Sequence, residues 1–368
     1  MRPMNARRGD DGSSRDAFKP LELRLDRHNM PLVLLLVTVV LSVVAKVRWG
    51  DLGGGPAALP RDGTCAGIAA YEGPRVVVVG DVRGDAAALI ATLRAAGLVG
   101  ERRCDEWRGG RAVLVQTGNV VGHGPDWARA HDCLRGLQRL AAAAGGRVVR
   151  LAGNHELLWA EGRFHHAHAD DGDAARAAAV ADWKDEHRAG AVAAAHAAGP
   201  YLFTHAGLRP AVLAALGAPR GASAAALARV VNERLAVEVE ACAGRAACAF
   251  GDALLAAGPD RGGSGVGGPF WTDFGVLEAA NQDDLPEHLV QVVGHTAAAC
   301  DAKRRRGCAP VRHRADLAAV VVDAGMSRAL HGNRAYLEIV GGAVRARWLA
   351  RHRRWAQRDL AAPCRRSS

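Results

Sequence analysis

The feature that most constrains the fold of this chain is a series of short apolar runs, each ending in a polar or glycine-rich turn. The run Arg147–Ala152 is followed directly by Gly153-Asn154-His155-Glu156. Comparable runs end in such turns at Val76–Asp81, Ala112–Gly118, Tyr201–Gly207 and Leu289–Thr296. Short β-branched runs bounded by turn residues are typical of buried strands. The pattern therefore predicts a sheet whose strands end in polar loops.

Helical patterns separate the first of these runs. They are expected over Asp85–Ala96, Pro125–Ala144, residues 157–200 and Ser223–Ala241, and proline at the first turn suits the second of them. Further strands are expected at Leu317–Val322, Ala335–Val340 and Ala343–Leu349. Strands that alternate with helices, followed by a strand-rich second half, predict an α/β sandwich.

The N-terminal region divides into three predicted segments. Residues 1–30 have a disordered composition, 31–47 contain the uncharged apolar run Pro31–Ala45, and 48–73 form a linker rich in glycine and proline. The apolar run is shorter than the ~20 residues of a typical membrane span. It fits a signal anchor or a cleaved signal peptide better than a buried helix. The basic residues before the apolar run outnumber those that follow it. This charge difference predicts a single-pass membrane protein whose globular domain is lumenal or extracellular, or a protein secreted after signal cleavage.

Composition limits the remaining possibilities. The chain has 368 residues, 49% of them hydrophobic, so the segment 74–350 can form one sizeable domain. Its net charge of +10 is concentrated partly in a basic tail at 351–368, but aromatic residues make up only 5%, so nucleic-acid binding is not expected. Among eight cysteines, Cys242 with Cys248 and Cys300 with Cys308 could close short disulfide loops or remain ordinary thiols.

The strand-end loops carry side chains suited to metal chemistry. The loops present Asp81, Asn119, Asn154, His205 and His295. Loops at the carboxyl ends of strands build the site in open α/β sheets, so these side chains should converge on one pocket. Mixed oxygen and nitrogen ligands suit manganese, iron or zinc. Any one of these histidines alone would be read more simply as a structural residue.

The ordered motifs resemble those of a known family. They are Gly80-Asp81-Val82-Arg83-Gly84, Gly118-Asn119 with Gly122-His123-Gly124, Gly153-Asn154-His155-Glu156, His205-Ala206-Gly207 and Gly294-His295-Thr296. From about Arg75 to Leu349 the chain resembles the calcineurin-like metallophosphoesterases, and more closely the Ser/Thr protein phosphatase branch that includes the Shewanella-like protein phosphatases. The resemblance implies a β-sandwich flanked by helices, in α-β-β-α layers, and hydrolysis of phosphate monoesters by a dinuclear metal site.

The resemblance also implies a role for each matching residue. Asp81 corresponds to a ligand of the first metal, and Asn154, His205 and His295 correspond to ligands of the second. His155 corresponds to the catalytic histidine that protonates the leaving alcohol. Glu156 stands where a partner acid would orient and support the catalytic site.

Several motif positions depart from the family pattern. Arg83 replaces a metal-binding histidine, and a guanidinium has no lone pair with which to ligate. Asn119 replaces the bridging aspartate, and a neutral amide bridges two dications poorly. Gly122 and His123 replace an Asp-Arg pair, and Asp273 stands where a phosphate-binding arginine is expected. We therefore expect at most one retained site for manganese, iron or zinc, with Arg83 and His123 as weak substrate-binding residues.

Three hypotheses follow. The first is a membrane-tethered phosphatase-like protein with strongly reduced or lost activity, a pseudophosphatase that binds a phosphorylated protein or an acidic partner. The second is an active phosphatase that uses one metal or an unusual ligand set. The third is a nonenzymatic lumenal domain in which the pocket is a relic.

Overall fold

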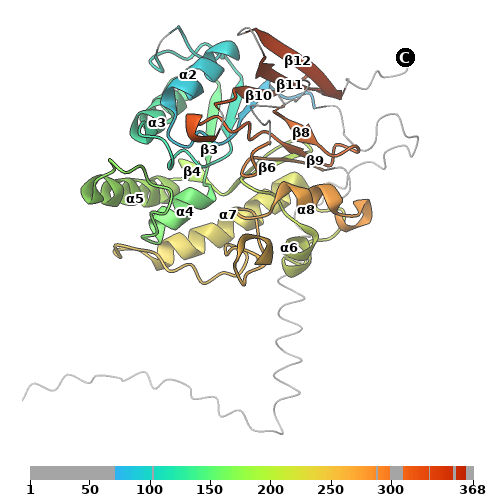
Figure 1. Ribbon diagram of the computed structural model, residues 1–368. Helices are drawn as coiled ribbons and strands as arrows, with labels where there is room; N and C mark the ends of the chain where they lie inside the picture. The colour runs from blue at the N-terminus through green and yellow to red at the C-terminus, as the bar shows by residue number, and fades with distance from the viewer. Residues whose placement is uncertain are drawn as a thin grey trace, which may run out of the picture. The chain divides into compact units, whose positions relative to one another are not determined.

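The computed structural model describes residues 71–101, 103–286, 289–298, 310–330, 332–350 and 354–361 (Figure 1). The described residues form two mixed sheets with helices against them. Most strands and helices lie where the apolar runs and helical patterns predict them. The exceptions are in the alanine-rich stretch before Tyr201 and beyond Leu349.

The larger sheet has seven strands in the order β12-β11-β10-β1-β2-β3-β4. Strands β1 to β4 are parallel, whereas β10, β11 and β12 add antiparallel neighbours beside β1. The bounds are Val76–Val79 for β1, Val113–Gln116 for β2, Arg147–Leu151 for β3, Val192–Ala193 for β4, Ala335–Val340 for β10, Ala343–Leu349 for β11 and Trp355–Ala361 for β12. Strand β12 occupies part of the segment predicted as a basic tail.

The smaller sheet has five strands in the order β5-β6-β7-β9-β8. Strands β6, β7 and β9 are parallel, and the edge strands β5 and β8 are antiparallel to their neighbours. The bounds are Ala195–Ala198 for β5, Tyr201–Thr204 for β6, Val290–Val293 for β7, Arg312–His313 for β8 and Ala319–Val321 for β9.

Strand β1 shows how the layers are held together. Val77 and Val79 lie in an apolar cluster with helices α2 (Ala86–Ala95) and α3 (Trp127–Ala143). Val76 and Val78 point the opposite way and lie in a second cluster with β6 and β7. This alternation follows from the two-residue period of a strand. It confirms the predicted α/β sandwich of two sheets flanked by helices.

Helices also cover the smaller sheet. Helix α7 (Ala224–Ala241) contacts β5 and β6, and α8 (Phe274–Ala279) packs against apolar residues of β7 and β9. The other helical segments are α4 (Asn154–Ala160), α5 (Asp173–Arg188), α6 (Pro210–Ala215), η1 (Pro259–Arg261), η2 (Gln282–Asp284) and η3 (Arg328–Leu330).

The helical stretch predicted over 157–200 is wrong at 161–172, which lies between α4 and α5 without helix, and in its C-terminal part. Helix α5 ends at Arg188, and Gly190 follows with a φ of 71°. The alanine-rich stretch beyond it forms β4 and β5, which pair with β3 and β6. Tertiary pairing thus overrides the helix preference of alanine.

Two disulfides are present among the described cysteines. Cys242–Cys248 joins two of the cysteines singled out from the sequence, and Cys104–Cys133 ties the loop before β2 to α3. Cys300 and Cys308 lie outside the described residues.

The predicted single-pass membrane location is corrected. Within the residues that the structure describes, no helix is both long and apolar enough to cross a bilayer. The apolar run Pro31–Ala45, from which that location was inferred, lies outside the described residues, as do residues 1–30 and 48–70. The described fold therefore gives a membrane location no support.

Candidate functional site

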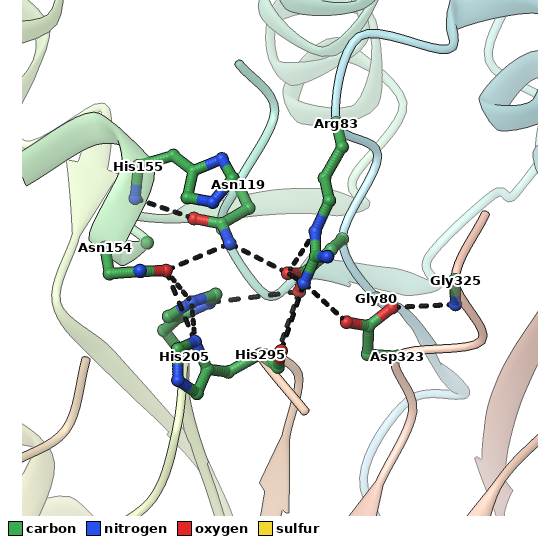
Figure 2. A network of polar contacts seen from close by, with 12 residues as sticks. Gly80, Arg83, Asn119, Asn154, His155, His205, His295, Asp323 and Gly325 are labelled. Carbon is green, nitrogen blue, oxygen red and sulfur yellow. Dashed lines mark hydrogen bonds and ion pairs between the residues drawn. The ribbon is translucent and has the colours of Figure 1, made fainter. Parts of the chain in front are cut away.

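The carboxyl ends of five strands deliver polar side chains to one buried cluster (Figure 2). Asp81 follows β1, Asn119 follows β2 and Asn154 follows β3, while His205 and His295 follow β6 and β7 of the other sheet. All five side chains are buried. The two sheets thus bring together the residues that the sequence places at strand ends.

The backbone of this site is strained. Arg83, Asn119, His123 and His295 have φ values of 47°, 56°, 58° and 65°, and only one other non-glycine residue in the described ranges has positive φ. Such conformations cost of order 1–3 kcal/mol each and are kept where the surrounding structure imposes them. The loops are therefore held in conformations that local preference alone would not select.

Arg83 is enclosed by two carboxylates. Its Nη2 donates to Asp81 Oδ2 at 2.6 Å, to Asp323 Oδ2 at 2.8 Å and to the carbonyl oxygen of His295 at 3.0 Å. Its Nε also donates to Asp81 Oδ2, at 3.1 Å. Only 10% of the Arg83 side chain is exposed, and neither carboxylate is exposed at all. The guanidinium is thus a fixed buried cation (Figure 2).

The charges of this group are interdependent. Burial raises the pKa of Asp81, but the charge of Arg83 and the hydrogen bond from the His295 backbone nitrogen lower it further, so Asp81 remains ionised. Burial and the charge of Asp81 together raise the pKa of Asp323 to about 7. Burial lowers the pKa of Arg83, but the two carboxylates raise it above its usual value. The site therefore holds a permanent cation beside an ionised Asp81.

Asn119 fits its position as an amide. Its Nδ2 donates to Asp81 Oδ2 at 2.8 Å and to Asn154 Oδ1 at 3.0 Å, and its Oδ1 accepts from the His155 backbone nitrogen at 2.9 Å. A Cβ at Gly153 would lie 2.3 Å from Asn119 Oδ1, so glycine is required for this close approach. An aspartate at position 119 would lack both N–H donors.

Glu156 organises the loop after β2. Its carboxylate accepts from the backbone nitrogens of Asn119 at 2.9 Å and Val120 at 2.7 Å, and from those of Val121 at 3.2 Å and Gly153 at 2.8 Å. Glu156 thus fixes the backbone from which Asn119 reaches the cluster.

Asn154, His205 and His295 bring three ligand atoms together. Asn154 Oδ1 lies 2.9 Å from His205 Nε2 and 3.3 Å from His295 Nδ1, and the two ring nitrogens are 3.2 Å apart. Two ligand atoms that bind the same tetrahedral zinc ion at about 2.05 Å are separated from each other by about 3.3 Å. The spacing therefore fits a divalent metal.

The protonation pattern of these residues supports the same interpretation. His205 Nδ1 donates to the Thr117 carbonyl oxygen at 2.8 Å, so a neutral His205 presents the lone pair of Nε2 toward Asn154 Oδ1. Burial lowers the pKa of His205 and that of His295, which favours the neutral rings. Two lone pairs facing each other at 2.9 Å repel unless a cation lies between them.

His123 lies in the same loop after β2 as Asn119, and His155 lies in the first turn of α4. His155 Nδ1 is 3.3 Å from the Val121 carbonyl oxygen, and a Cβ at Gly122 would lie 2.6 Å from that nitrogen. Burial and the nearby Arg83 cation lower the pKa of His123 to about 4. His123 is consequently neutral near pH 7 and offers a phosphate group no charge.

Three residues of the region were not singled out from the sequence. Asp323 follows β9 and the apolar run Leu317–Val322, so the strand-end rule could have found it. His166 lies in the loop between α4 and α5, where no strand marks it. Arg261 Nη2 donates to Asp273 Oδ2 at 2.6 Å and thereby neutralises the carboxylate that was expected to repel phosphate.

Two facing sheets whose strand ends supply aspartate, asparagine and histidine define a metallophosphoesterase-type α/β sandwich. Comparison with known proteins agrees, since residues 74–224 match the family model described as calcineurin-like phosphoesterase. Residues 74–224 therefore carry a calcineurin-like phosphoesterase domain match, in agreement with the family that the motifs resemble.

Curated relatives place the chain near one branch of that family. It is 43% identical over 96 residues to an uncharacterized protein of Schizosaccharomyces pombe, covering 26% of this chain and 29% of that protein. It is 35% identical over 97 residues to Shewanella-like protein phosphatase 2 of Arabidopsis thaliana, covering 26% and 24%. It is 35% identical over 92 residues to Shewanella-like protein phosphatase 1 of Plasmodium berghei, covering 25% of each. The matches thus span less than a third of these relatives.

Solved structures support the fold. A cold-active protein tyrosine phosphatase superposes with a TM-score of 0.54 at 15% identity, covering 83% of this chain and 85% of that one. The cold-active protein-tyrosine phosphatase of a psychrophilic Shewanella species gives 0.53 at 15% identity, covering 80% and 83%.

Proposed function

We propose that the protein is a calcineurin-like phosphoesterase domain protein in which hydrolysis is strongly reduced or lost, and that it binds a phosphorylated protein or an acidic partner. The observation that carries this proposal is the Arg83 guanidinium held between Asp81 and Asp323. The motif match puts a first-metal ligand at position 83. A buried arginine there supplies positive charge without a ligand atom.

The chemistry of the cluster supports reduced turnover. The two-metal mechanism needs a carboxylate that bridges both metals, and Asn119 instead donates an N–H to Asp81. Neither the Arg83 side chain nor the Asn119 side chain can act as the first-metal ligand that the family pattern requires at its position. A divalent metal held by Asn154, His205 and His295 would supply Lewis-acid charge beside a phosphoryl group.

The remaining groups suit binding of an anion. Arg83 Nη1 makes no hydrogen bond within the described residues, so its N–H groups remain as donors for a phosphate oxygen that reaches the cluster. Arginine is well suited to phosphate because its planar donors match the phosphate oxygens. The net charge of +10 also favours association with an acidic partner.

Calorimetry with a phosphoserine peptide tests the proposal on the full chain. A matched peptide with unmodified serine serves as the ligand control, and both are measured with Mn²⁺ and with a chelator. We expect at least ~10-fold tighter binding of the phosphopeptide, and weaker binding by Arg83→Met. Equal affinity for the two peptides would contradict the proposal and favour the relic pocket.

A second candidate function is an active phosphatase with one metal. The spacing of the Asn154, His205 and His295 ligand atoms favours it, because it fits a metal without the first site. In that case His155 would donate a proton to the leaving alcohol oxygen. Turnover that depends on Mn²⁺ and disappears in Asn154→Ala would establish this second function.

A further inference from the structure

Three histidine rings lie close together beside the loop after β2, which carries Asn119. One nitrogen from each of His123, His155 and His166 lies within 4.8 Å of the other two. The ring centroids are 4.5 Å apart for His155 and His166, 4.9 Å for His123 and His166, and 5.4 Å for His123 and His155. His155 is buried, His123 is partly buried and His166 is exposed, so the group opens to solvent on one side.

We propose that His123, His155 and His166 form a three-imidazole site for a borderline divalent metal such as Zn²⁺. This site shares no residue with the Asn154, His205 and His295 group, and the inference does not depend on the proposed function. Three imidazoles with one open position form a ligand set that zinc accepts. Imidazole also suits copper and nickel, which are alternatives within the same ligand chemistry.

The backbone around the three rings is fixed. The His123 backbone nitrogen donates to the His166 carbonyl oxygen at 2.6 Å, which ties the two segments together. Gly122 makes room for His155, since a Cβ there would contact the His155 ring. The arrangement thus depends on the glycine and histidine that replace the Asp-Arg pair of the family motif.

The loop that carries His166 is anchored by Asp171. This carboxylate accepts from Trp127 Nε1 and from the His168 backbone nitrogen, both at 2.9 Å, and Arg176 donates to the Asp171 carbonyl oxygen. The anchor holds the loop against α3 while leaving the His166 ring at the surface.

The ring nitrogens are available to a metal. Within the described residues, the His123 and His166 rings make no hydrogen bond, and His155 Nδ1 has the Val121 carbonyl oxygen at 3.3 Å. A histidine ligand commonly donates its second ring N–H to such a carbonyl, which leaves the other nitrogen for the metal. Nitrogens around a tetrahedral zinc are about 3.3 Å apart, so the nitrogen separations must shorten by at most about 1.5 Å. The His166 ring, which is stacked on His155 at an interplanar angle of 18°, must also turn to point its nitrogen at the metal. The exposed His166 ring is the one free to do so.

Metal titration of the full chain tests this site. Zn²⁺ binding is measured by calorimetry, and Co²⁺ by visible absorption, which reports coordination geometry without reference to activity. We expect His166→Ala to weaken one binding event by at least ~100-fold, more than the change of an outer-shell residue causes. His123→Ala must have the same effect on the same event.

Two controls keep the outcome unambiguous. His165→Ala changes an exposed neighbour that is outside the cluster and must leave Zn²⁺ binding unchanged. Asn154→Ala removes a ligand atom of the other group and leaves the three imidazoles in place, so the event that His166→Ala removes must persist in it. Identical Zn²⁺ binding by wild type, His165→Ala and His166→Ala, all with the same thermal stability, would overturn the proposal whatever the phosphopeptide measurement shows.

Discussion

Arg83 Nη2 lies 2.6 Å from Asp81 Oδ2, and both side chains are buried. This ion pair occupies the place where the family motif calls for a histidine and an aspartate on the same metal. A cation fixed by covalent structure cannot leave or exchange, whereas a metal can. The charge balance of the first site is thus built into the fold.

Removing the Arg83 cation should destabilise the protein. Arg83→Met leaves the buried carboxylates of Asp81 and Asp323 without their cation. We expect a loss of about 3–5 kcal/mol in the free energy of unfolding, because an unpaired charge remains buried. Urea denaturation at pH 7 measures the change.

The matched control is Arg108→Met, whose ion pair with Glu106 is exposed. An ion pair this exposed is screened by solvent and contributes little to stability, so this variant should resemble the wild type. If Arg83→Met were no less stable than Arg108→Met, the buried ion pair would not have the role assigned to it.

Asn119→Asp should make the stability of the protein depend on metal. The substitution places a second carboxylate beside Asp81 and removes the N–H that now lies between them. Without metal the like charges repel, and with Mn²⁺ they become ligands. We expect a lower Tm than wild type in chelator and a larger upward shift of Tm on adding Mn²⁺.

Asn232→Asp provides the comparison for this variant. Asn232 also bonds backbone groups, at Ala194 and Ala195, but it lies outside the polar cluster. Its substitution should lower Tm without any added Mn²⁺ dependence. Equal Mn²⁺ shifts in Asn119→Asp and wild type would refute this account of position 119.

Glu156→Gln should loosen the loop after β2. The amide can accept with only one of its terminal atoms, so about half of the four backbone N–H donors lose their acceptor. Each buried donor left unsatisfied costs about 1–3 kcal/mol. Hydrogen exchange at the amides of Asn119, Val120 and Val121 should become faster. Glu161→Gln, which affects only an exposed pair with Arg163, should leave these amides protected. Unchanged protection in Glu156→Gln would be inconsistent with its position in the structure.

Glu186 should make part of the stability depend on pH. Burial raises the pKa of this carboxyl, but hydrogen bonds from His131 and Arg150 and the charge of Arg150 lower it further, well below its usual value. Its contribution is therefore complete above the ordinary carboxyl pKa near 4.5 and is lost as the pH falls below that value.

We accordingly expect Glu186→Gln to be less stable than wild type at pH 7, with the difference narrowing in acid. Urea midpoints measured from pH 7 down to about pH 3 test this slope. Asp182→Asn alters an exposed neighbour that pairs with Arg135 at 3.6 Å and should change little. A difference between Glu186→Gln and wild type that stayed constant across this range would contradict the prediction.

Much of the site was predictable because strand ends carry it. The apolar run at Val76–Val79 and the following Asp81 give both the strand and the position of its polar end. The same reasoning locates Asn154 and His205. Neighbouring parallel strands of one sheet end on the same side of it, which is why spacing along the chain groups Asp81 with Asn154. His205 follows a strand of the other sheet, and the packing of the two sheets brings it to the same cluster.

What the sequence could not supply were contacts between distant segments. Asp323 lies 240 residues from Arg83, and nothing local to either residue indicates that they pair. The disulfide between Cys104 and Cys133 is hidden for the same reason. Strands β4 and β5 were missed because alanine favours a helix until pairing with β3 and β6 decides otherwise.

The most direct test of the central claim is Mn²⁺-dependent hydrolysis of p-nitrophenyl phosphate by the full chain, compared with Asn154→Ala. We predict no turnover above that of Asn154→Ala, because Arg83 and Asn119 provide no first metal site. Mn²⁺-dependent turnover by the wild type that is lost in Asn154→Ala would contradict the account and show that the arginine-containing site is an active one.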